Sequence, residues 1–357
     1  MMLSAQLQCV TQREGRILML NNALRNPAAA SIISLVCVII FYVVFGGVDV
    51  SKLFGAASWV NFAANLGIVA IPVGLLMISG ELDISIGAMI PAGSMATAIV
   101  SGHYGFPIHY AIVTVLLLGL IMGIVNGFLT IRTSVPSLII TLGTLVAMQG
   151  IVLAASKFLT GEASVAIEAP EWAKFAFGQL IGASHQVIII WWVGIAFVAW
   201  FYVHKTKFGN WIFAMGGDRE SARNAGIPVD RLTILLFILS ATAASFTGMC
   251  QAILFNSAQV SGGMNIIFNV IVSVVVGGTL LTGGFGSVLG IFLGTLTFAV
   301  VSQGIYFTQI DRNWSSLIIG FMLLIAVAMN ESFRAFAFRA SVRKKGATPE
   351  PSPEKAT

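Results

Sequence analysis

Long apolar runs, separated by short polar or Gly- and Pro-containing breaks, occupy most of the chain. A helix that crosses the hydrocarbon core of a membrane needs about 17 to 25 mainly apolar residues. The runs at 86–101 and 266–281 are short, so a tilted, a broken and a re-entrant segment stay open for both. The pattern predicts an all-α polytopic membrane protein with about ten transmembrane helices. The predicted spans are 27–45, 57–79, 86–101, 108–130, 136–156, 187–203, 232–254, 266–281, 287–307 and 314–330.

The composition supports a membrane protein and excludes two other classes. Of the 357 residues, 57% are hydrophobic and 9% are charged, and the mean hydropathy is +0.93. A soluble domain has about 25% charged residues, and a disordered chain is also more polar than this one. The three cysteines lie far apart in the sequence, so we expect neither a disulfide framework nor a metal site. The expected surroundings are a lipid bilayer, and no nucleic acid is expected as a partner.

The basic residues predict the orientation in the membrane. With the N-terminus in the cytoplasm, 15 of the 19 lysines and arginines fall on the cytoplasmic side, and such an excess marks the inner face. We therefore expect a cytoplasmic segment at 1–26, a transmembrane domain at 27–330 and a cytoplasmic, basic, disordered tail at 331–357. A cleavable signal peptide is the alternative, but no small-x-small cleavage site follows the first span.

Three runs carry a small residue at every fourth position, which lines one face of a helix with small groups. In lipid such a face lets neighbouring backbones approach closely and gain dispersion contacts. We expect these helices to be interior, although chance can account for any single run in a chain with 37 glycines. The runs are Gly119, Gly123 and Gly127; Ala88, Ala92 and Ala96; and Gly286, Gly290 and Gly294.

Two regions share a plan of an apolar span, a glycine-bearing break and a small-residue helix, at 76–96 and 276–294. Such pairs are typical of transporters built from two internal repeats around a central pathway. Both breaks fall on the cytoplasmic side of the predicted topology, and Glu81 and Asp83 in the first have no neighbouring base. As an alternative to a hinge role, Glu81 and Asp83 can have a structural role and cap the N-terminus of the next helix, where the helix dipole favours negative charge. The candidate hinge residues of the two breaks are Glu81, Asp83, Gly283, Gly284 and Gly286.

The segment 206–231 is the longest predicted cytoplasmic connection between spans. Asp218 suits an N-cap, 219–225 can wind two helical turns, Gly226 suits the position just past the helix, and Pro228 prevents its continuation. A short, terminated helix outside the membrane can seat in a groove of a partner protein. The alternative is a surface connector held by lipid headgroups.

The chain shows no chemistry of its own. We find no nucleotide-binding loop of the type Gly-x-x-x-x-Gly-Lys-Ser/Thr, no His-Glu-x-x-His, and no grouping typical of a nucleophile or a metal site. It also lacks the intramembrane acids and bases expected of many proton-coupled carriers. We therefore expect no enzyme activity, and energy for any pumping has to enter from another subunit.

Five stretches carry a specific resemblance. They are SGELDISIG at 79–87, Asn126-Gly127 followed by Pro136 and TLGT at 141–144, GGDRESARNAGI at 216–227, NSAQ at 256–259 and GGTLLTGGFGSV at 277–288. They span about 57–330 in the right order and resemble the permease subunits of bacterial ABC importers for monosaccharides, of the ribose type.

The resemblance implies a permease of the bacterial inner membrane that moves a monosaccharide or similar small polyol inward. It implies a second permease subunit, two cytoplasmic ATPase subunits that bind ATP and magnesium, and a periplasmic sugar-binding protein. No cofactor is expected in this chain itself. The resemblance also casts the predicted cytoplasmic helix as the coupling helix received by the ATPase: Asp218, Arg219, Glu220, Ser221, Ala222, Arg223, Asn224, Ala225, Gly226 and Ile227.

The chain departs from this family at Ile267 and Asn269, where acidic residues are common, and at Phe285, where a base is common. The chain thus lacks both the acidic and the basic residues, and each loss can compensate for the other. The missing charges nevertheless weaken any assignment of the substrate by analogy with the family. For the translocation path the candidates are polar intramembrane residues, and hydrogen bonding between helices is the competing role for each. They are Asn65, Asn126, Thr141, Thr144, Gln149 and Asn269.

Other functions stay open at this stage. A permease of the same superfamily can carry branched-chain amino acids or a signalling sugar. An autonomous secondary carrier or channel needs an ion-coupling site, and no paired intramembrane carboxylates indicate one.

Overall fold

The computed structural model describes residues 27–44, 57–182, 184–261 and 263–304, with isolated positions beyond. Within these ranges the chain is almost entirely helical. The apolar helices are α2 (Pro27–Val44), α4 (Ala57–Ile78), α5 (Ile86–Thr97), α6 (Ile108–Arg132), α7 (Ser137–Thr160), α9 (Ile188–Lys205), α12 (Val229–Phe255), α13 (Met264–Val276) and α14 (Val288–Gly304). The shorter elements are the π-helices η1 (Ala98–His103) and η2 (Lys174–Gly178), the helices α8 (Glu171–Ala173), α10 (Lys207–Gly217) and α11 (Arg219–Asn224), and the strands β1 (Ser164–Ala166), β2 (Leu180–Ile181), β3 (His185–Gln186) and β4 (Ser257–Gln259).

The helices confirm the prediction of an all-α polytopic membrane protein. Five of those described are long and apolar enough to cross a membrane, namely α4, α6, α7, α9 and α12. A helix occupies each of the first nine predicted spans, and the tenth, 314–330, lies outside the described ranges apart from isolated positions. The segments 1–26 and 331–357 also lie outside them. The two runs singled out as short contain α5, with 12 residues, and α13, with 13.

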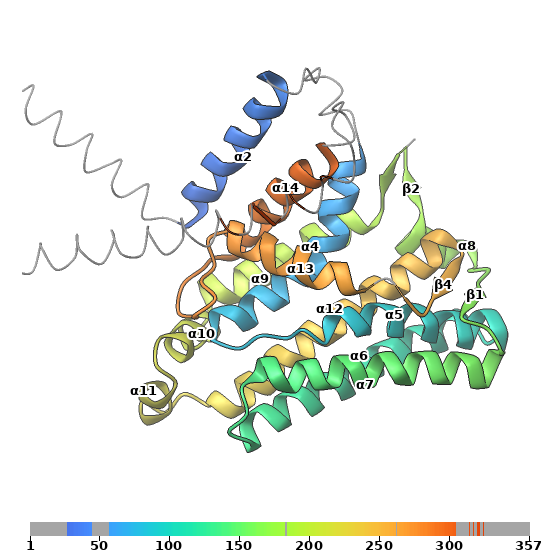
Figure 1. Cartoon of the computed structure of the whole chain (residues 1–357), viewed down its shortest axis with the longest axis horizontal. Helices are drawn as coiled ribbons and strands as arrows, with labels where there is room; N and C mark the ends of the chain where they lie inside the picture. Colours follow the sequence, from blue (N-terminus) through green and yellow to red (C-terminus); the bar gives the residue numbers. More distant parts are fainter. Residues whose placement is uncertain are drawn as a thin grey trace, which may run out of the picture.

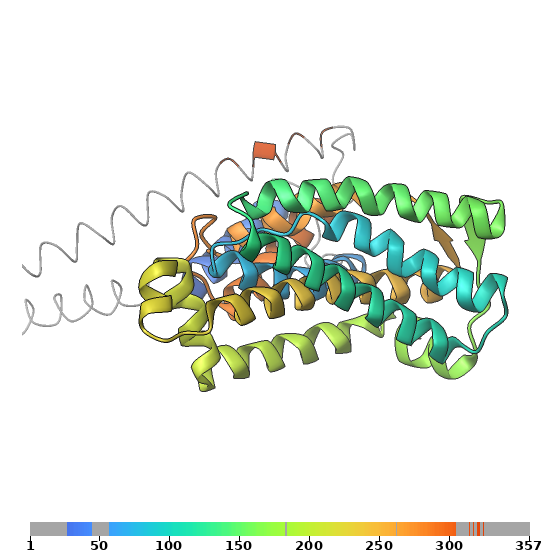
Figure 2. The same ribbon diagram turned by 90° about the horizontal axis from the view of Figure 1, so that it is seen from below.

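The long helices run between two distinct ends of the molecule. Helices α5, α6, α7 and α12 lie along one another, with α10 and α11 at one end and β1, β4 and α8 at the other (Figure 1). The view turned by 90° keeps this arrangement (Figure 2). β1 pairs antiparallel with β4, and β2 pairs antiparallel with β3.

Small residues bring helices close, as the fourfold spacing predicts. The expectation that α6 is interior is wrong, because 33% of its apolar span is buried. A Cβ atom on Gly119 would lie 2.5 Å from the Cα of Thr242, and one on Gly123 would lie 2.3 Å from the Cα of Ile238. Helices α6 and α12 therefore meet at backbone distance. Gly294 packs in the same way on the backbone of α13, where its Cβ would lie 2.2 Å from the Ser273 carbonyl oxygen. These contacts supply the dispersion energy that favours helix association in lipid.

Helix α5 lies in the core although it is short. Eleven of its twelve residues are buried, among them Ile86, Met89 and Met95. Helix α7 in contrast buries a single stripe that includes Thr141, Leu145 and Val152 and exposes apolar side chains elsewhere. An exposed apolar surface on a helix of this length is what a lipid environment permits.

Helix α10 was not predicted from the sequence. Thr206 caps its N-terminus, since its hydroxyl oxygen accepts the Phe208 N–H at 3.2 Å. Its buried residues are Gly209, Ile212 and Met215, which share one face. Three glycines in eleven residues lower the intrinsic helix propensity, so tertiary packing rather than local sequence stabilises this helix.

Candidate coupling site and polar cavity

Helix α11 has the capped geometry that the sequence predicts. Its N-cap Asp218 accepts the N–H of Ser221 at 2.6 Å. At the C-terminus Gly226 has φ +81° and donates its N–H to the Arg223 carbonyl at 3.0 Å, while Ile227 donates to the Ala222 carbonyl at 3.1 Å. This pair of bonds is a Schellman motif, and Pro228 directly precedes α12. The helix is thus fixed at both ends within six residues.

The N-terminal cap is charged under physiological conditions. The pKa of Asp218 is lowered from its ordinary value because its carboxylate accepts the backbone N–H of Ser221. A lowered folded-state pKa means that the cap stabilises the helix above the ordinary aspartate pKa. This stabilisation is lost only as the pH falls through the lowered value.

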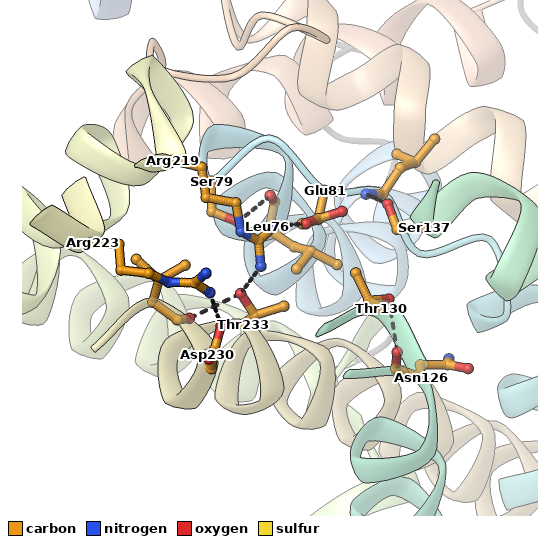
Figure 3. Close-up of polar contacts among 12 residues, drawn as sticks. Leu76, Ser79, Glu81, Asn126, Thr130, Ser137, Arg219, Arg223, Asp230 and Thr233 are labelled. Carbon is orange, nitrogen blue, oxygen red and sulfur yellow. Dashed lines mark hydrogen bonds and ion pairs between the residues drawn. The ribbon is translucent and has the colours of Figure 1, made fainter. Parts of the chain in front are cut away.

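An ion pair ties α11 to the first break. The Arg219 guanidinium donates to the carboxylate of Glu81 and, at 2.8 Å, to the hydroxyl of Thr233 on α12 (Figure 3). This contact corrects the expectation that Glu81 has no neighbouring base and that it caps the next helix. The sequence hides the pair because the two residues are 138 positions apart.

Three backbone segments meet beside this ion pair, in what we call the glycine junction (Ile78, Gly80, Gly216, Gly283 and Gly284). The Gly284 N–H donates to the Ile78 carbonyl at 2.8 Å, which joins the second break to the end of α4. A Cβ on Gly216, near the end of α10, would lie 1.8 Å from that carbonyl oxygen and 2.4 Å from the Gly284 nitrogen. A Cβ on Gly283 would lie 2.9 Å from the Gly80 Cα. Only glycine allows the three segments to approach this closely.

Of the candidate hinge residues, Glu81, Gly283 and Gly284 therefore lie together, next to the candidate coupling helix. Gly80, Gly283 and Gly284 have φ of +90°, +81° and +75°, a region that side-chain-bearing residues rarely adopt. Both breaks are non-helical, one between α4 and α5 and the other between α13 and α14. The two regions that share a plan in the sequence are thus in direct contact through their breaks. Gly286 lies in the same break, just before α14.

Asp83 has a structural role in the first break, although it is not the cap of α5, whose N-cap residue is Ser85. Its carboxylate is fully buried and accepts the backbone N–H of Ser85 at 2.9 Å, the Ser85 hydroxyl at 2.6 Å and the Ser240 hydroxyl at 2.8 Å. The Ser85 hydroxyl in turn accepts the side-chain N–H of Asn126 at 2.8 Å. This network fixes the start of α5 against α6 and α12.

Asp83→Ala is expected to destabilise the protein. The substitution leaves two serine hydroxyls and one backbone N–H buried without their acceptor, and each such loss costs about 1–3 kcal/mol. Thermal unfolding of the detergent-solubilised protein, followed by size-exclusion chromatography, measures the effect. Asp83→Asn, which keeps one acceptor oxygen, should be milder, and Asp230→Ala at an exposed position is the control. An Asp83→Ala protein as stable as the wild type would contradict this role.

A partly open cavity of about 430 Å³ lies at the end opposite α11. Apolar side chains supply most of its surface, and we call it the polar cavity because amide and hydroxyl groups also line it. Of the six predicted path residues, it brings together Asn65 on α4 and Asn269 on α13. Its described lining consists of Ser58, Asn61, Phe62, Asn65, Leu66, Ile90, Gln186, Thr247, Gln251, Phe255, Ile266, Asn269 and Gln303.

The other four predicted path residues do not line this cavity. Asn126 bonds Ser85, and the hydroxyl of Thr141 donates to the Ser137 carbonyl at 2.8 Å. Thr144 donates to the Thr141 carbonyl, and Gln149 donates to the sulfur of Met264. These contacts fit the alternative that the sequence left open, hydrogen bonding within and between helices.

The sequence reasoning missed most of the cavity. Asn61 and Asn65 lie one helical turn apart on α4, and Thr247 and Gln251 do so on α12. That i, i+4 spacing places each pair on one helix face and is the signal that could have found them. Gln186 could not be found in this way, because it comes from the short strand β3.

The amides of the cavity form a connected set. Asn65 donates to the Gln186 side-chain oxygen at 2.8 Å and accepts from Gln251 at 3.4 Å. Asn61 donates to the Ser184 carbonyl and accepts the Gln186 N–H, both at 2.8 Å. The cavity walls on α4, β3 and α12 are therefore held by mutual hydrogen bonds.

An apolar helical bundle with a partly open cavity near one end, and a capped helix outside the bundle at the other, is an arrangement that suits a membrane transport component. The chain matches the family described as "Branched-chain amino acid transport system / permease component" over residues 55–327, and it belongs to this family.

Curated relatives carry import-permease names. The chain is 32% identical to the fructose import permease protein FrcC of Rhizobium meliloti over 324 residues, which are 87% of either chain. It is 32% identical to the autoinducer 2 import system permease protein LsrD of Photorhabdus laumondii, over 73% of this chain and 78% of the relative. It is 34% identical to the probable ABC transporter permease protein YphD of Escherichia coli, over 83% and 88%.

Family membership confirms the recognition made from the sequence motifs. The chain is a permease component in a membrane, and its part in transport is translocation rather than enzyme catalysis. A solved structure, PsaBC from Streptococcus pneumoniae in complex with Fab, aligns with a TM-score of 0.45 at 18% identity, over 81% of this chain and 94% of that one. That likeness is too distant to inform the fold.

Proposed function

We propose that this chain is the permease subunit of an ATP-driven importer that moves a monosaccharide or similar small polyol across the bacterial inner membrane. The observation that carries the proposal is the position of α11. A helix capped at both ends projects beside the glycine junction, and Arg219 connects it to Glu81 in the first break. A partner that moves α11 therefore moves both breaks.

The proposed partners are those that permease components of importers have in general, and the exposed helix α11 supports the cytoplasmic one. Two cytoplasmic ATPase subunits, which bind ATP with magnesium, would receive Asp218–Ile227, and a second permease would complete the path. A periplasmic binding protein would deliver the solute at the opposite end. The proposed orientation, with both termini in the cytoplasm, places α11 on the side where 15 of the 19 basic residues lie.

The names of the relatives support a sugar as the solute. FrcC is named for the import of fructose and LsrD for the import of autoinducer 2. The described lining of the polar cavity carries no charged side chain. A zwitterionic amino acid would find no counter-charge there, which favours a neutral solute over a branched-chain amino acid.

Purification from the native cells tests the proposal. The tagged chain, extracted in mild detergent after crosslinking, should recover an ATPase and a periplasmic binding protein, and the complex should hydrolyse ATP. Uptake of labelled sugars by the reconstituted complex, dependent on ATP, would support import. Recovery of the chain alone, together with transport by the chain alone in liposomes, would refute an ATP-driven mechanism.

A double-mutant cycle tests the link between α11 and the first break. Glu81→Gln and Arg219→Gln should each lower ATP-dependent uptake, and the double variant should be no worse than the stronger single variant. Side-chain exposures of 10% and 35% indicate a partly desolvated pair, for which coupling of about 0.5–3 kcal/mol is expected.

The neighbouring ion pair provides the matched comparison. Arg223 and Asp230 form a second pair between α11 and α12, with exposures of 60% and 52%. Exposed pairs contribute about 0–1 kcal/mol, so the same cycle on these residues should give a smaller interaction energy. Equal interaction energies in the two cycles would contradict the proposal that the pair of Glu81 and Arg219 links α11 to the first break.

A further inference from the structure

We propose that the polar cavity at the end opposite α11 is a binding site for the transported solute, and that it takes a neutral polyhydroxylated molecule. The inference rests on the proposed function and deepens it, because it places recognition within the permease as well as in the binding protein. The central residues are Asn65, Gln251 and Asn269.

The chemistry of the lining indicates the class of ligand. Every polar side chain among the described lining residues is an amide or a hydroxyl: Ser58, Asn61, Asn65, Gln186, Thr247, Gln251, Asn269 and Gln303. Amides and hydroxyls both donate and accept hydrogen bonds, as do the hydroxyls of a sugar. An ion would enter an apolar bundle without a counter-charge, which is unfavourable.

Two aromatic rings complete the match. Phe62 and Phe255 line the same cavity. Ligand sites typically combine apolar and aromatic walls with a few placed polar groups, in a volume of about 300–1,000 Å³. The cavity volume of about 430 Å³ falls within this range.

The hydrogen bonds divide the amides into a fixed set and an open set. Asn65 and Gln186 orient each other at 2.8 Å, whereas the Gln251 contact to Asn65 is long at 3.4 Å. Asn269 and Gln303 make no hydrogen bond with another residue of the described ranges. Both amides are half-buried at the surface of the cavity, so their donors and acceptors are exposed to whatever fills it. The open amides are available to a ligand.

The cavity is connected to the coupling site by continuous helices. Asn65 and Ile78 are 13 positions apart on α4, which is about 20 Å at 1.5 Å per residue. Helix α13 runs from the cavity at Asn269 to Gly277, its C-cap, which precedes the second break. The cavity wall on α4 thus ends at the glycine junction, and the wall on α13 ends at the second break, which forms part of that junction. Movement of the glycine junction therefore changes the shape of the cavity.

The test uses the complete transporter, with its ATPase and binding protein, reconstituted in proteoliposomes. Uptake of radiolabelled D-fructose, D-ribose and D-sorbitol is measured first with the wild type at saturating binding protein. Asn269→Leu and Gln251→Leu are then compared for the solute that is carried. Each should lower the maximal uptake rate about three- to tenfold, the loss expected for one hydrogen bond. Asn269→Gln, which keeps an amide, should retain more uptake.

The controls separate recognition from folding. Gln179→Leu changes an exposed glutamine that lies outside the cavity lining, and it should leave uptake at the wild-type level. Every variant must copurify with the ATPase and elute as the wild type does. Wild-type uptake with unchanged rates in Asn269→Leu and Gln251→Leu would overturn the cavity site alone. A wild type that carries none of the three solutes would overturn the choice of a neutral polyol for this cavity, whereas recovery of the ATPase and the binding protein decides the proposed function separately.

Discussion

Gly216→Ala is expected to abolish ATP-driven uptake, whereas Gly217→Ala is expected to preserve it. The two glycines are adjacent at the end of α10, but their surroundings differ. A Cβ on Gly216 would lie 1.8 Å from the Ile78 carbonyl oxygen, and a Cβ on Gly217 would meet no atom within 4 Å. The obstructing atoms at Gly216 are backbone, so they cannot rotate away. One methyl group therefore forces α10 off the end of α4.

The expected size of the effect follows from the cost of overpacking. Inserted methyl groups typically cost about 1–3 kcal/mol, and a bias of that size changes the population of a coupled state about five- to 150-fold. Uptake and ATP hydrolysis, measured on the same reconstituted complex, would reveal hydrolysis without transport. Gly217→Ala is the control, because it shows any effect that an alanine at the end of α10 has without the close backbone contact. Full uptake in Gly216→Ala would show that close contact at the glycine junction is not required.

The sequence predicted the elements that depend on local pattern. The lengths of the apolar runs predicted where the helices lie, and the capping residues Asp218 and Gly226 predicted both ends of α11. The fourfold spacing of Gly119 and Gly123 predicted a close helix contact. Each signal lies within one or two helical turns, where side-chain chemistry and backbone geometry act on the same few residues.

Contacts between distant segments could not be predicted in this way. Glu81 appeared to have no basic partner because Arg219 is 138 residues away. Asn65 and Asn269 share a cavity, while Asn126, equally polar and intramembrane, instead bonds Ser85. Residue type alone does not distinguish a pathway amide from a packing amide, because the difference lies in which helices face each other.

The glycine junction explains why the two breaks and the helix α11 occur in one molecule. Gly283 and Gly284 give the second break a backbone that side-chain-bearing residues disfavour, and this conformation lets it contact the end of α4. Helix α10 supplies Gly216 to the same point and leads directly into α11. An input at α11 therefore reaches α4 and the segment after α13 without an intervening flexible loop.

Gly226→Pro is expected to abolish association with the ATPase while leaving membrane insertion intact. Gly226 has φ +81°, and its N–H donates to the Arg223 carbonyl at 3.0 Å. Proline fixes φ near −65° and has no N–H, so the residue loses both its conformation and its bond, at a cost of about 3 kcal/mol. The C-terminal half of α11 then unwinds, and the surface that would enter the ATPase is lost. Copurification of the ATPase with the tagged permease measures the result.

Gly161→Pro is the matched control for this prediction. Gly161 ends α7 with φ +77°, and its N–H donates to the Lys157 carbonyl at 3.0 Å. Both glycines thus have a left-handed φ and donate their N–H to a carbonyl of the preceding helix, but Gly161 lies at the opposite end of the molecule, near β1. Because both prolines remove a left-handed residue and its hydrogen bond at a helix end, a selective loss of the ATPase in Gly226→Pro assigns docking to α11. If both variants lose the ATPase equally, general destabilisation explains the result and the docking role of α11 fails.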